Sequence, residues 1–596
     1  EGTGYMNSRY IGRYLIVGLA VIGGVALAGM TLGGCGLLVT ALWTEGIEEK
    51  TILVIDFQKG LEEYVPGKAL TKALHGKKPT VRSYIEGLIK ARDDKRVVGV
   101  IARIGGGLRI ARVQEIRDAI KAFRKKGKFA VAYAETFGEF AGGHSKYYLA
   151  TAFDEIYLQP SGDIGFNGLM MATPFIKGTL DKLGVEAQMD HRKEYKNFKN
   201  FFTDTKFSKA HKEASLKIIN SLFDQICQGI AQSRGLTVEK IKDVANNGPL
   251  LAQEALEAKF VDGLAYRDEI REKLKKRFGK ECKFLKFKKY FKKAKSPFRS
   301  GKRIALIYGV GGVKRGKSGY DPMTEESMMG SDTVCKAFRQ AIKDDDVKAI
   351  LFRVDSPGGS YVASDTIWRE TIRAKDKGKP VIVSMGSLAA SGGYFVSMEA
   401  HKIVAQPGTL TGSIGVLAGK MYSKGLYDKL GISWDEVHTS RNAGLWQPFK
   451  RFSRSEWDRL QASLDRIYED FTAKVAKGRK LPKETVLEIA KGRVWTGLDA
   501  KERGLVDELG GFERALELAK EASKIGKDEK IELKLYPKPD SAFAEMMQSM
   551  LDEATSAPME DVYAQMRPLV KLARRMGLYR SKSDGVLRNP AVDNSF

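Results

Sequence analysis

The sequence predicts an α/β fold made of two tandem, homologous domains. The first observation is an internal repeat, because KGTLDKLGV from Lys177 and KGLYDKLGI from Lys424 agree at six of nine positions. The second observation is that apolar, β-branched runs alternate with amphipathic stretches along both halves of the chain. Such alternation is typical of βαβ units and of a mainly parallel sheet. A repeat with so long a period indicates duplication of a whole domain.

The repeat keeps its register over much of both halves. At an offset of 247 positions, Gln159-Pro160 matches Gln406-Pro407, and His191 matches His438. At an offset of 245, Ala255 matches Ala500 and Asp262 matches Asp507. We therefore predict a first domain over residues 51–290 and a second over residues 303–535. A basic linker, residues 291–302, joins them.

Both predicted domains begin with an apolar strand. These runs are TILVIDF from Thr51 and RIALIYGV from Arg303, and each is followed by an amphipathic helical stretch. Further strands are predicted at VVGVIARI from Val97 and AILFRV from Ala349. The order of strand, helix and strand is the same in both halves.

Residues 14–43 carry no charge and predict a transmembrane helix. At about 1.5 Å per residue this segment exceeds the roughly 30 Å hydrocarbon core of a bilayer. Arg9 and Arg13 precede it and acidic residues follow, so we expect residues 1–13 in the cytoplasm and the rest outside. The alternative, a cleaved signal peptide, has a shorter apolar region. Cys35 ends a segment LGGC that faintly resembles a lipoprotein processing box, but we expect a small residue packed in a Gly-rich helix.

The lysine-rich run from Arg271 to Arg303 is expected to be the end of a helix followed by the linker, and a lipid headgroup or phosphate contact is the alternative. Residues 536–596 are predicted to form a helical tail, with amphipathic helices from Ser541 and from Met559. Their Met-rich apolar face is expected to pack on the domain or on another protomer.

Composition narrows the classes of function. The net charge of +27 would suit an anionic lipid surface, an acidic partner or nucleic acid, so charge does not choose among them. The four cysteines include no C-x-x-C pair and no cluster with histidines, which argues against a zinc site or a disulfide framework. We expect no metal, no cofactor and no nucleic-acid partner.

Two glycines follow a predicted strand of the second domain. The strand AILFRV runs into Asp355-Ser356-Pro357-Gly358-Gly359-Ser360, and a helical pattern comes next. Adjacent glycines allow a substrate carbonyl to approach backbone N–H groups, as stabilisation of an oxyanion requires. A tight strand-to-helix turn without function is the alternative.

Ser391 ends the next strand, in the segment LAASGGY, where Ala390 and Gly392 flank it. A serine at a strand-to-helix turn with small neighbours is accessible to substrate, and nearby helix N–H groups favour developing negative charge. This pattern is typical of a nucleophile. A serine that only caps the helix or fills space is the alternative.

The segments SPGG, AASGGY and TGSIG, the last from Thr411 to Gly415, closely resemble the signal peptide peptidase A family, also called protease IV, in its long two-domain form. The resemblance covers the chain from the predicted anchor to about Leu535. It implies that Ser391 is the nucleophile, that Lys196 is the general base, and that Ser413 holds the lysine. The N–H groups near Gly358, Gly359 and Gly392 would then form the oxyanion hole.

This resemblance also implies a fold, an activity and a location. The fold would consist of stacked ββα turns similar to those of crotonases and the Clp protease. The activity would be that of a membrane-bound serine endopeptidase with a Ser/Lys dyad, which degrades residual signal peptides and other hydrophobic peptides. We expect a single-pass protein of the inner membrane with its domains on the extracytoplasmic side, assembled as a homotetramer.

The repeat gives an independent test of the dyad. At the 247-residue offset Ser391 corresponds to His144, and Lys196 corresponds to Ala443. Each half therefore lacks the residue that the other supplies, which favours one composite site. Taken alone, Lys196 would be one surface lysine among many.

Lysine can act as a base at neutral pH only when burial lowers its pKa by several units from about 10.4. Aromatic neighbours of Lys196 could supply part of that burial: Tyr195, Phe198 and Phe201. Lys193 and Lys199 are alternatives to Lys196 if the alignment slips.

Other patterns in the sequence suggest different functions. The segment from Gly311 to Ser318 matches the Walker A pattern, but Gly319 and Pro322 interrupt the helix that phosphate binding would need, so we expect a loop. A Ser-His-Asp triad would use His401 or His438 as base. A catalytically inactive scaffold and an acyl-CoA enzyme remain alternatives, and the latter would need a paired carboxylate in the pocket.

Overall fold

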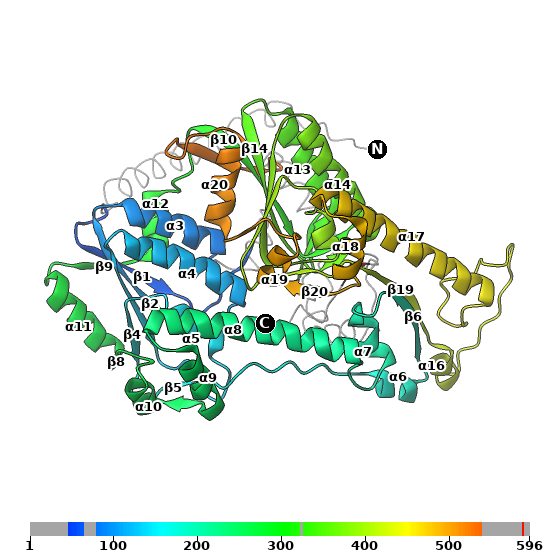
Figure 1. The fold of residues 1–596 in the computed structure, drawn as a ribbon, viewed down its shortest axis with the longest axis horizontal. Helices are drawn as coiled ribbons and strands as arrows, with labels where there is room; N and C mark the ends of the chain where they lie inside the picture. The colour runs from blue at the N-terminus through cyan, green and yellow to red at the C-terminus, as the bar shows by residue number, and fades with distance from the viewer. Residues whose placement is uncertain (1–45, 65–78, 322–325, 539–586, 589–596) are drawn as a thin grey trace, which may run out of the picture.

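The computed structural model describes residues 46–64, 79–321, 326–538 and 587–588, and these form a mixed α/β fold with two large sheets (Figure 1). The predicted membrane segment 14–43, with Cys35, lies outside the described residues, and so do the predicted tail helices from Ser541 and Met559. Within the described ranges, no helix has the length and apolarity needed to cross a bilayer.

The first half of the chain builds a six-stranded sheet in which every strand pair is parallel, in the order β8-β4-β3-β2-β1-β9. Its elements are β1 Thr51–Asp56, α3 Val81–Asp93, β2 Val97–Arg103, α4 Ile110–Lys125, β3 Phe129–Ala134, α5 His144–Ala150, β4 Glu155–Leu158, β5 Asp163–Ile164, α6 Lys177–Leu183, β6 Glu186–Arg192, η1 Asn197–Lys199, α7 Asn200–Thr203, α8 Lys209–Arg234, α9 Val238–Asn247, β7 Leu250–Leu251, α10 Ala252–Glu257, β8 Gly263–Leu264, α11 Arg267–Phe278, β9 Lys283–Lys286 and α12 Phe287–Ala294.

The second half builds the larger sheet, in the order β20-β18-β16-β14-β10-β22; β17 pairs with β16 off this path, and β21 pairs with β17. The pairs of this sheet are parallel except β18 with β20. Its elements are β10 Lys302–Val310, β11 Gly312–Lys314, β12 Gly319–Asp321, β13 Glu326–Gly330, α13 Ser331–Lys343, β14 Val347–Ser356, β15 Gly358–Gly359, α14 Tyr361–Asp376, β16 Val381–Ala390, α15 Gly392–Phe395, β17 Lys402–Ala405, β18 Leu410–Gly412, β19 Val416–Tyr422, α16 Lys424–Lys429, α17 Arg454–Arg479, α18 Lys483–Ile489, β20 Val494–Thr496, α19 Gly497–Glu502, β21 Glu508–Leu509, α20 Phe512–Ala522, β22 Ile531–Tyr536 and β23 Leu587–Arg588.

The sequence repeat is also a repeat of elements. Helices α8 and α17 have 26 residues each, and their first residues, Lys209 and Arg454, are 245 positions apart. The same offset relates α10 to α19 and β8 to β21. The α/β fold expected from alternating strands and helices is therefore confirmed, and the corresponding elements of the two halves follow the repeat.

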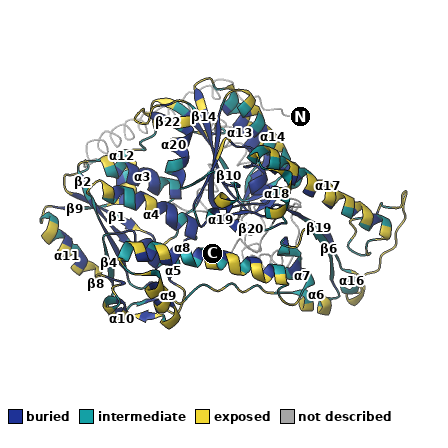
Figure 2. Cartoon of the chain, viewed as in Figure 1, coloured by how far each residue is buried: buried dark blue, intermediate teal, exposed yellow. Residues whose placement is uncertain are grey.

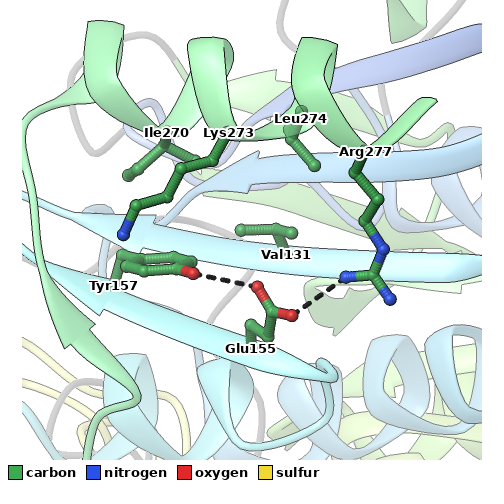
Figure 3. A pocket seen from close by; sticks show the side chains of 7 residues that line it. All are labelled: Val131, Glu155, Tyr157, Ile270, Lys273, Leu274 and Arg277. Atoms are coloured by element: carbon green, nitrogen blue, oxygen red, sulfur yellow. Dashed lines mark hydrogen bonds and ion pairs between the residues drawn. The ribbon is translucent and has the colours of Figure 1, made fainter. Parts of the chain in front are cut away.

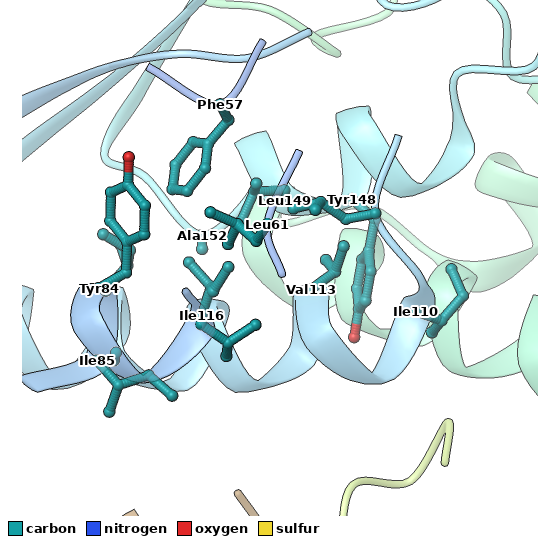
Figure 4. Packing of buried hydrophobic residues seen from close by; sticks show 14 of the residues in the cluster. Phe57, Leu61, Tyr84, Ile85, Ile110, Val113, Ile116, Tyr148, Leu149 and Ala152 are labelled. Carbon is teal, nitrogen blue, oxygen red and sulfur yellow. The ribbon is translucent and has the colours of Figure 1, made fainter. Parts of the chain in front are cut away.

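The hydrophobic core is continuous across the two halves. Helices α3 and α4 pack on the first sheet through Phe57, Tyr84 and Ile116 (Figure 4). The same cluster of buried residues includes Leu388 of β16 and Phe512 of α20 from the second half. Figure 2 shows this buried interior where α3, α4 and α20 approach the second sheet. Because the halves share a core, each can position side chains for the other.

An extended arm carries the first half across to the second. After β5 the chain runs to α6 and β6 beside β19, and the long helix α8 returns it (Figure 1). Strand β6 pairs antiparallel with β19 over its whole length, from Arg192 opposite Val416 to Glu186 opposite Tyr422. This pairing brings the segment after β6 to the end of the second sheet.

The lysine-rich run from Arg271 differs from the expected helix end and linker. Besides the end of α11 it contains strand β9 and helix α12. Phe287 and Tyr290 of α12 are buried, and Phe287 stacks on Tyr84 of α3 with ring centroids 4.9 Å apart. Aromatic residues between the lysines give α12 an apolar face, and burial of that face stabilises the helix. The many lysines made this segment look like a solvated linker in the sequence.

Candidate active site

Ser391 lies at the turn between β16 and α15, in the centre of the second half. Its backbone adopts φ 55° and ψ −116°, a conformation that residues other than glycine rarely adopt. The Ser391 N–H donates to the carbonyl of Gly412 in β18 at 2.8 Å, and the side chain is fully buried. A strained serine at a strand-to-helix turn is the geometry of a nucleophile elbow.

Lys196 comes from the first half, between β6 and the short helix η1, and its side chain extends to Ser391. Its Nζ lies 2.9 Å from Oγ of Ser391, 2.9 Å from the carbonyl oxygen of Ser413 and 3.0 Å from Oγ of Ser413. The backbone of the neighbouring Tyr195 is fixed by a hydrogen bond from its N–H to the carbonyl of Lys491 at 3.1 Å. The structure thus brings together Lys196, Ser391 and Ser413, which are far apart in the sequence.

Burial determines the charge state of this lysine. The Lys196 side chain has no exposed surface, and removal from water lowers its pKa from the ordinary value of 10.5 to about 7. Desolvation disfavours the ammonium form, and carbonyl and hydroxyl oxygens are its hydrogen-bonding neighbours. A substantial fraction of Lys196 is therefore a neutral amine at neutral pH.

Gly492 is a part of the site that the sequence did not indicate. It has φ +79°, and a Cβ at this position would lie 2.6 Å from Cβ of Lys196. A side chain here would displace the lysine, so glycine is required for its close approach. The contact joins residues that are far apart in the chain, and a pattern of local motifs carries no signal for it.

Ser413 follows β18 and is also fully buried. It has φ 52°, and its N–H donates to the carbonyl of Arg493 at 2.6 Å. With its own backbone fixed, Ser413 presents both its hydroxyl and its carbonyl oxygen to Lys196. It therefore fixes where the amine can lie.

The three glycines expected at the oxyanion hole lie together. A Cβ on Gly392 would lie 3.1 Å from Cα of Gly358 and 3.1 Å from the backbone nitrogen of Gly359. The N–H of Gly358 donates to Oγ of Ser356 at 3.2 Å. Larger residues would close the space between β15 and the start of α15, directly beside Ser391.

The rival bases lie elsewhere. His401 is at the opposite end of β16 from Ser391, and its Nδ1 accepts a hydrogen bond from the N–H of Val381 at 3.0 Å. His438 lies 3.0 Å from Glu436 in the loop after α16. Among the alternative lysines, Lys193 is exposed and Lys199 lies 3.6 Å from Asp190.

The Walker-like segment is part of a small sheet. It begins with Gly311 at the end of β10 and runs through β11 to a turn at Gly316, after which strand β12 begins at Gly319. The chain thus continues as a strand where phosphate binding would need a helix N-terminus. No helix follows the segment at this point, as expected, but strand β11 occupies part of it, where a loop was expected.

The first-half counterpart of Ser391, His144, is the first residue of α5. It is buried, and its Nε2 accepts a hydrogen bond from the N–H of Asn167 at 3.2 Å. Burial lowers its pKa to about 4, so it is neutral near pH 7. Ala443, the counterpart of Lys196, lies exposed in the loop after α16.

A small pocket of about 200 Å³ opens between α11 and the first sheet (Figure 3). Glu155 within it accepts hydrogen bonds from Tyr157 at 3.0 Å and Arg277 at 3.0 Å. Its carboxylate is thus already paired. None of the residues that line this pocket belongs to the cluster around Ser391.

Comparison with known proteins agrees with the geometry. The family model described as Peptidase family S49 matches residues 122–281 and 373–526. The chain is 32% identical to the chloroplastic serine protease SPPA of Arabidopsis thaliana, over 78% of this chain and 68% of that protein. It is also 32% identical to Protease 4 of Salmonella typhi, over 82% of this chain and 79% of that protein. A solved membrane-bound stomatin-specific protease aligns with 40% of this chain and all of its own, at 15% identity and a TM-score of 0.24.

The family match and the similarity to Protease 4 define the protein as a serine-type endopeptidase. The chain belongs to peptidase family S49, and within it the chain is related to signal peptide peptidase A, or protease IV.

Proposed function

We propose that this protein is a membrane-bound endopeptidase that degrades residual signal peptides and other hydrophobic peptides with a Ser391/Lys196 dyad. The observation that carries the dyad is the 2.9 Å separation between a fully buried Lys196 Nζ and Ser391 Oγ. A neutral amine has two N–H donors and one lone pair. The two oxygens of Ser413 accept the donors, and the lone pair faces the Ser391 hydroxyl.

In the first half-reaction, Nζ of Lys196 takes the proton of the Ser391 hydroxyl while Oγ forms a bond to the scissile carbonyl carbon. The carbonyl π electrons move to its oxygen, and N–H groups near Gly358, Gly359 and Gly392 stabilise the resulting oxyanion. For Gly358 to take part, its N–H has to leave Oγ of Ser356. When the C–N bond breaks, the ammonium gives its proton to the leaving nitrogen, and an acyl-enzyme remains.

In the second half-reaction, water replaces the departed amine. Lys196 accepts a proton from the water while the water oxygen attacks the carbonyl carbon of the ester. Collapse of this second intermediate breaks the bond to Oγ, and Lys196 returns the proton to Ser391. The enzyme is regenerated in its starting protonation state.

The edge of β15 supports peptide binding in an extended form. Strand β23 pairs antiparallel with β15, with Leu587 opposite Gly359 and Arg588 opposite Gly358. An edge strand that accepts such a segment can accept a peptide through the same main-chain hydrogen bonds. A substrate in this position would pass beside Ser391.

The membrane location rests on residues 14–43 as an anchor of the inner membrane, with the two halves on the extracytoplasmic side. The anchor would hold the site near hydrophobic peptides left in the bilayer. The ββα architecture similar to crotonases and the Clp protease, and assembly as a homotetramer, belong to the same proposal.

Ser413→Ala is expected to lower kcat about fivefold, because the loss of one hydrogen bond to the amine is worth about 1 kcal/mol. The carbonyl of residue 413 would still accept one N–H of Lys196. Steady-state hydrolysis of a fluorogenic peptide would measure the change. A complete loss, equal to that of Ser391→Ala, would contradict a role limited to orienting the lysine.

Substrate class can be tested with full-length protein in lipid vesicles. We expect a released signal peptide to be cleaved with a kcat/KM at least about tenfold above that of a hydrophilic peptide of equal length, because apolar contacts supply the binding energy. Ser391→Ala protein in the same vesicles is the control and should cleave neither. Equal turnover of both peptides would contradict a preference for hydrophobic substrates.

A further inference from the structure

Asp355 lies near the end of β14, directly before the segment that contains Gly358 and Gly359, and its side chain is buried. Its Oδ1 accepts a hydrogen bond from the N–H of Leu388 in β16 at 3.0 Å. Its own carbonyl accepts from the N–H of Gly311 at 2.9 Å. Leu388 is three residues before Ser391, so Asp355 is linked to the strand that carries the nucleophile.

The strand β16 bulges where Asp355 contacts it. Pairing with β14 passes from Val354 opposite Met385 to Ser356 opposite Ala389, so β16 contains two more residues than its partner in this interval. At such a bulge a backbone N–H leaves the regular ladder and needs another acceptor. The Asp355 carboxylate is that acceptor for Leu388.

The other carboxylate oxygen of Asp355 is held from the first half of the chain. Nη2 of Arg112, on α4, donates to Oδ2 of Asp355 at 2.8 Å. Nη1 of Arg112 donates to the carbonyl of Leu61 at 2.9 Å, which fixes the guanidinium on its own half. The Asp355 side chain is 8% exposed, and a carboxylate so deeply buried needs a cation beside it.

A second arginine, Arg353 of β14, binds other carboxylates. Arg353 uses its N–H groups on Glu63 and Glu115 of the first half and on Ser384 of β16. This fully bonded cluster joins the halves. These partners take all the N–H groups of the Arg353 guanidinium, so the link from α4 to the Asp355 carboxylate runs through Arg112.

We propose that Arg112 is a positioning residue that acts through Asp355 to hold the bulge of β16, and thereby sets Ser391 and the adjacent glycines against Lys196. The inference rests on the proposed Ser391/Lys196 mechanism. The first half then contributes twice to the site: it supplies the base, and it fixes the strand that carries the nucleophile. Arg112 itself contacts neither the dyad nor the substrate.

The test is the steady-state hydrolysis of one hydrophobic peptide by full-length variants. Arg112→Met and Asp355→Asn are each expected to lower kcat about 100-fold with KM within about threefold, because a small displacement of a nucleophile is costly. The double variant should lose about 100-fold as well, because the two residues act as a unit. Arg112→Lys keeps the charge, and its kcat should remain within about tenfold of the parent. The rise of kcat/KM with pH that follows deprotonation of Lys196 should keep its midpoint in this variant.

The matched control is Arg92→Met. Arg92 on α3 also joins the halves, through a hydrogen bond to Glu513 of α20 at 2.9 Å, but this pair does not contact Asp355. It should keep kcat within about threefold of the parent, since loss of this partly buried pair leaves the bond between Arg112 and Asp355 in place. An equal loss in Arg92→Met, additive losses in the double variant, or parent-like kcat in folded Arg112→Met would each overturn the proposal.

Failure of the mechanism itself gives a different pattern. If Ser391→Ala is active, both the dyad mechanism and this inference are wrong. If Ser391→Ala is inactive but Arg112→Met keeps parent-like activity, only this inference is wrong. Thermal unfolding shows whether each variant is folded. If Arg112→Met does not fold, Asp355→Asn and Arg112→Lys test the proposal instead. Full activity in Asp355→Asn overturns it. A selective loss of kcat in Asp355→Asn, together with partial activity in Arg112→Lys, supports it.

Discussion

Replacement of Ser391 with alanine is expected to lower peptide hydrolysis by at least about three orders of magnitude, because the acyl-enzyme cannot form without the nucleophile. Folding should be retained, since alanine fills the space of a buried serine and the N–H that bonds to Gly412 is unchanged. Steady-state hydrolysis of a hydrophobic peptide, with thermal unfolding of the same sample, would measure both.

The companion variant is Lys196→Ala, whose loss should be similar in size. The double variant with Ser391→Ala should be no less active than either single variant, because residues that act as one unit give non-additive losses. Turnover within about tenfold of the parent in either single variant would exclude the dyad, since general-base catalysis alone contributes about 10²- to 10⁴-fold.

Lys196→Arg is expected to be nearly as inactive as Lys196→Ala, although it keeps the positive charge. A guanidinium effectively never loses its proton in a protein, so it cannot accept the proton of Ser391. The 2.9 Å contact between Lys196 and Ser391 is compatible with two roles for the lysine, a general base or a fixed positive charge, and this variant distinguishes them. Lys199→Arg is the matched control, because Lys199 is close in sequence but pairs with Asp190, and it should keep parent-like activity.

Measurement of kcat and KM for both variants on one peptide would decide the point. Substantial turnover by Lys196→Arg would mean that residue 196 serves as a charge or a structural support. The proposed mechanism would then have to be replaced. A loss of equal size in Lys199→Arg would instead show that any change in this arm disrupts its packing.

The sequence could predict those parts of the site that depend on local patterns. Ser391 and the glycines beside it stand where an apolar strand meets a helix, and strand-to-helix turns can be recognised from a few residues. Lys196 required more, because its local segment resembles any basic surface. The family resemblance implied its role, and the repeat, which sets Ser391 against His144 and Lys196 against Ala443, gave an independent test of it.

The parts that the sequence could not predict depend on contacts between distant segments. Gly492 is needed because Lys196 lies against it, and the pair of Arg112 with Asp355 joins α4 to β14. Helix α12 could not be predicted from the sequence for a related reason. Its lysines dominate the local composition, while the burial of Phe287 depends on its contact with α3.

The pH dependence of kcat/KM tests most directly whether a neutral Lys196 is the base. Burial lowers the lysine pKa to about 7, so the neutral form gains population as the pH rises. We expect kcat/KM to rise about tenfold per pH unit well below this value and to level off above it, as for one group in the free enzyme. His401→Gln and His438→Gln should keep that midpoint. A midpoint near 10.4, as for free lysine, or loss of the limb in either histidine variant, would contradict the mechanism.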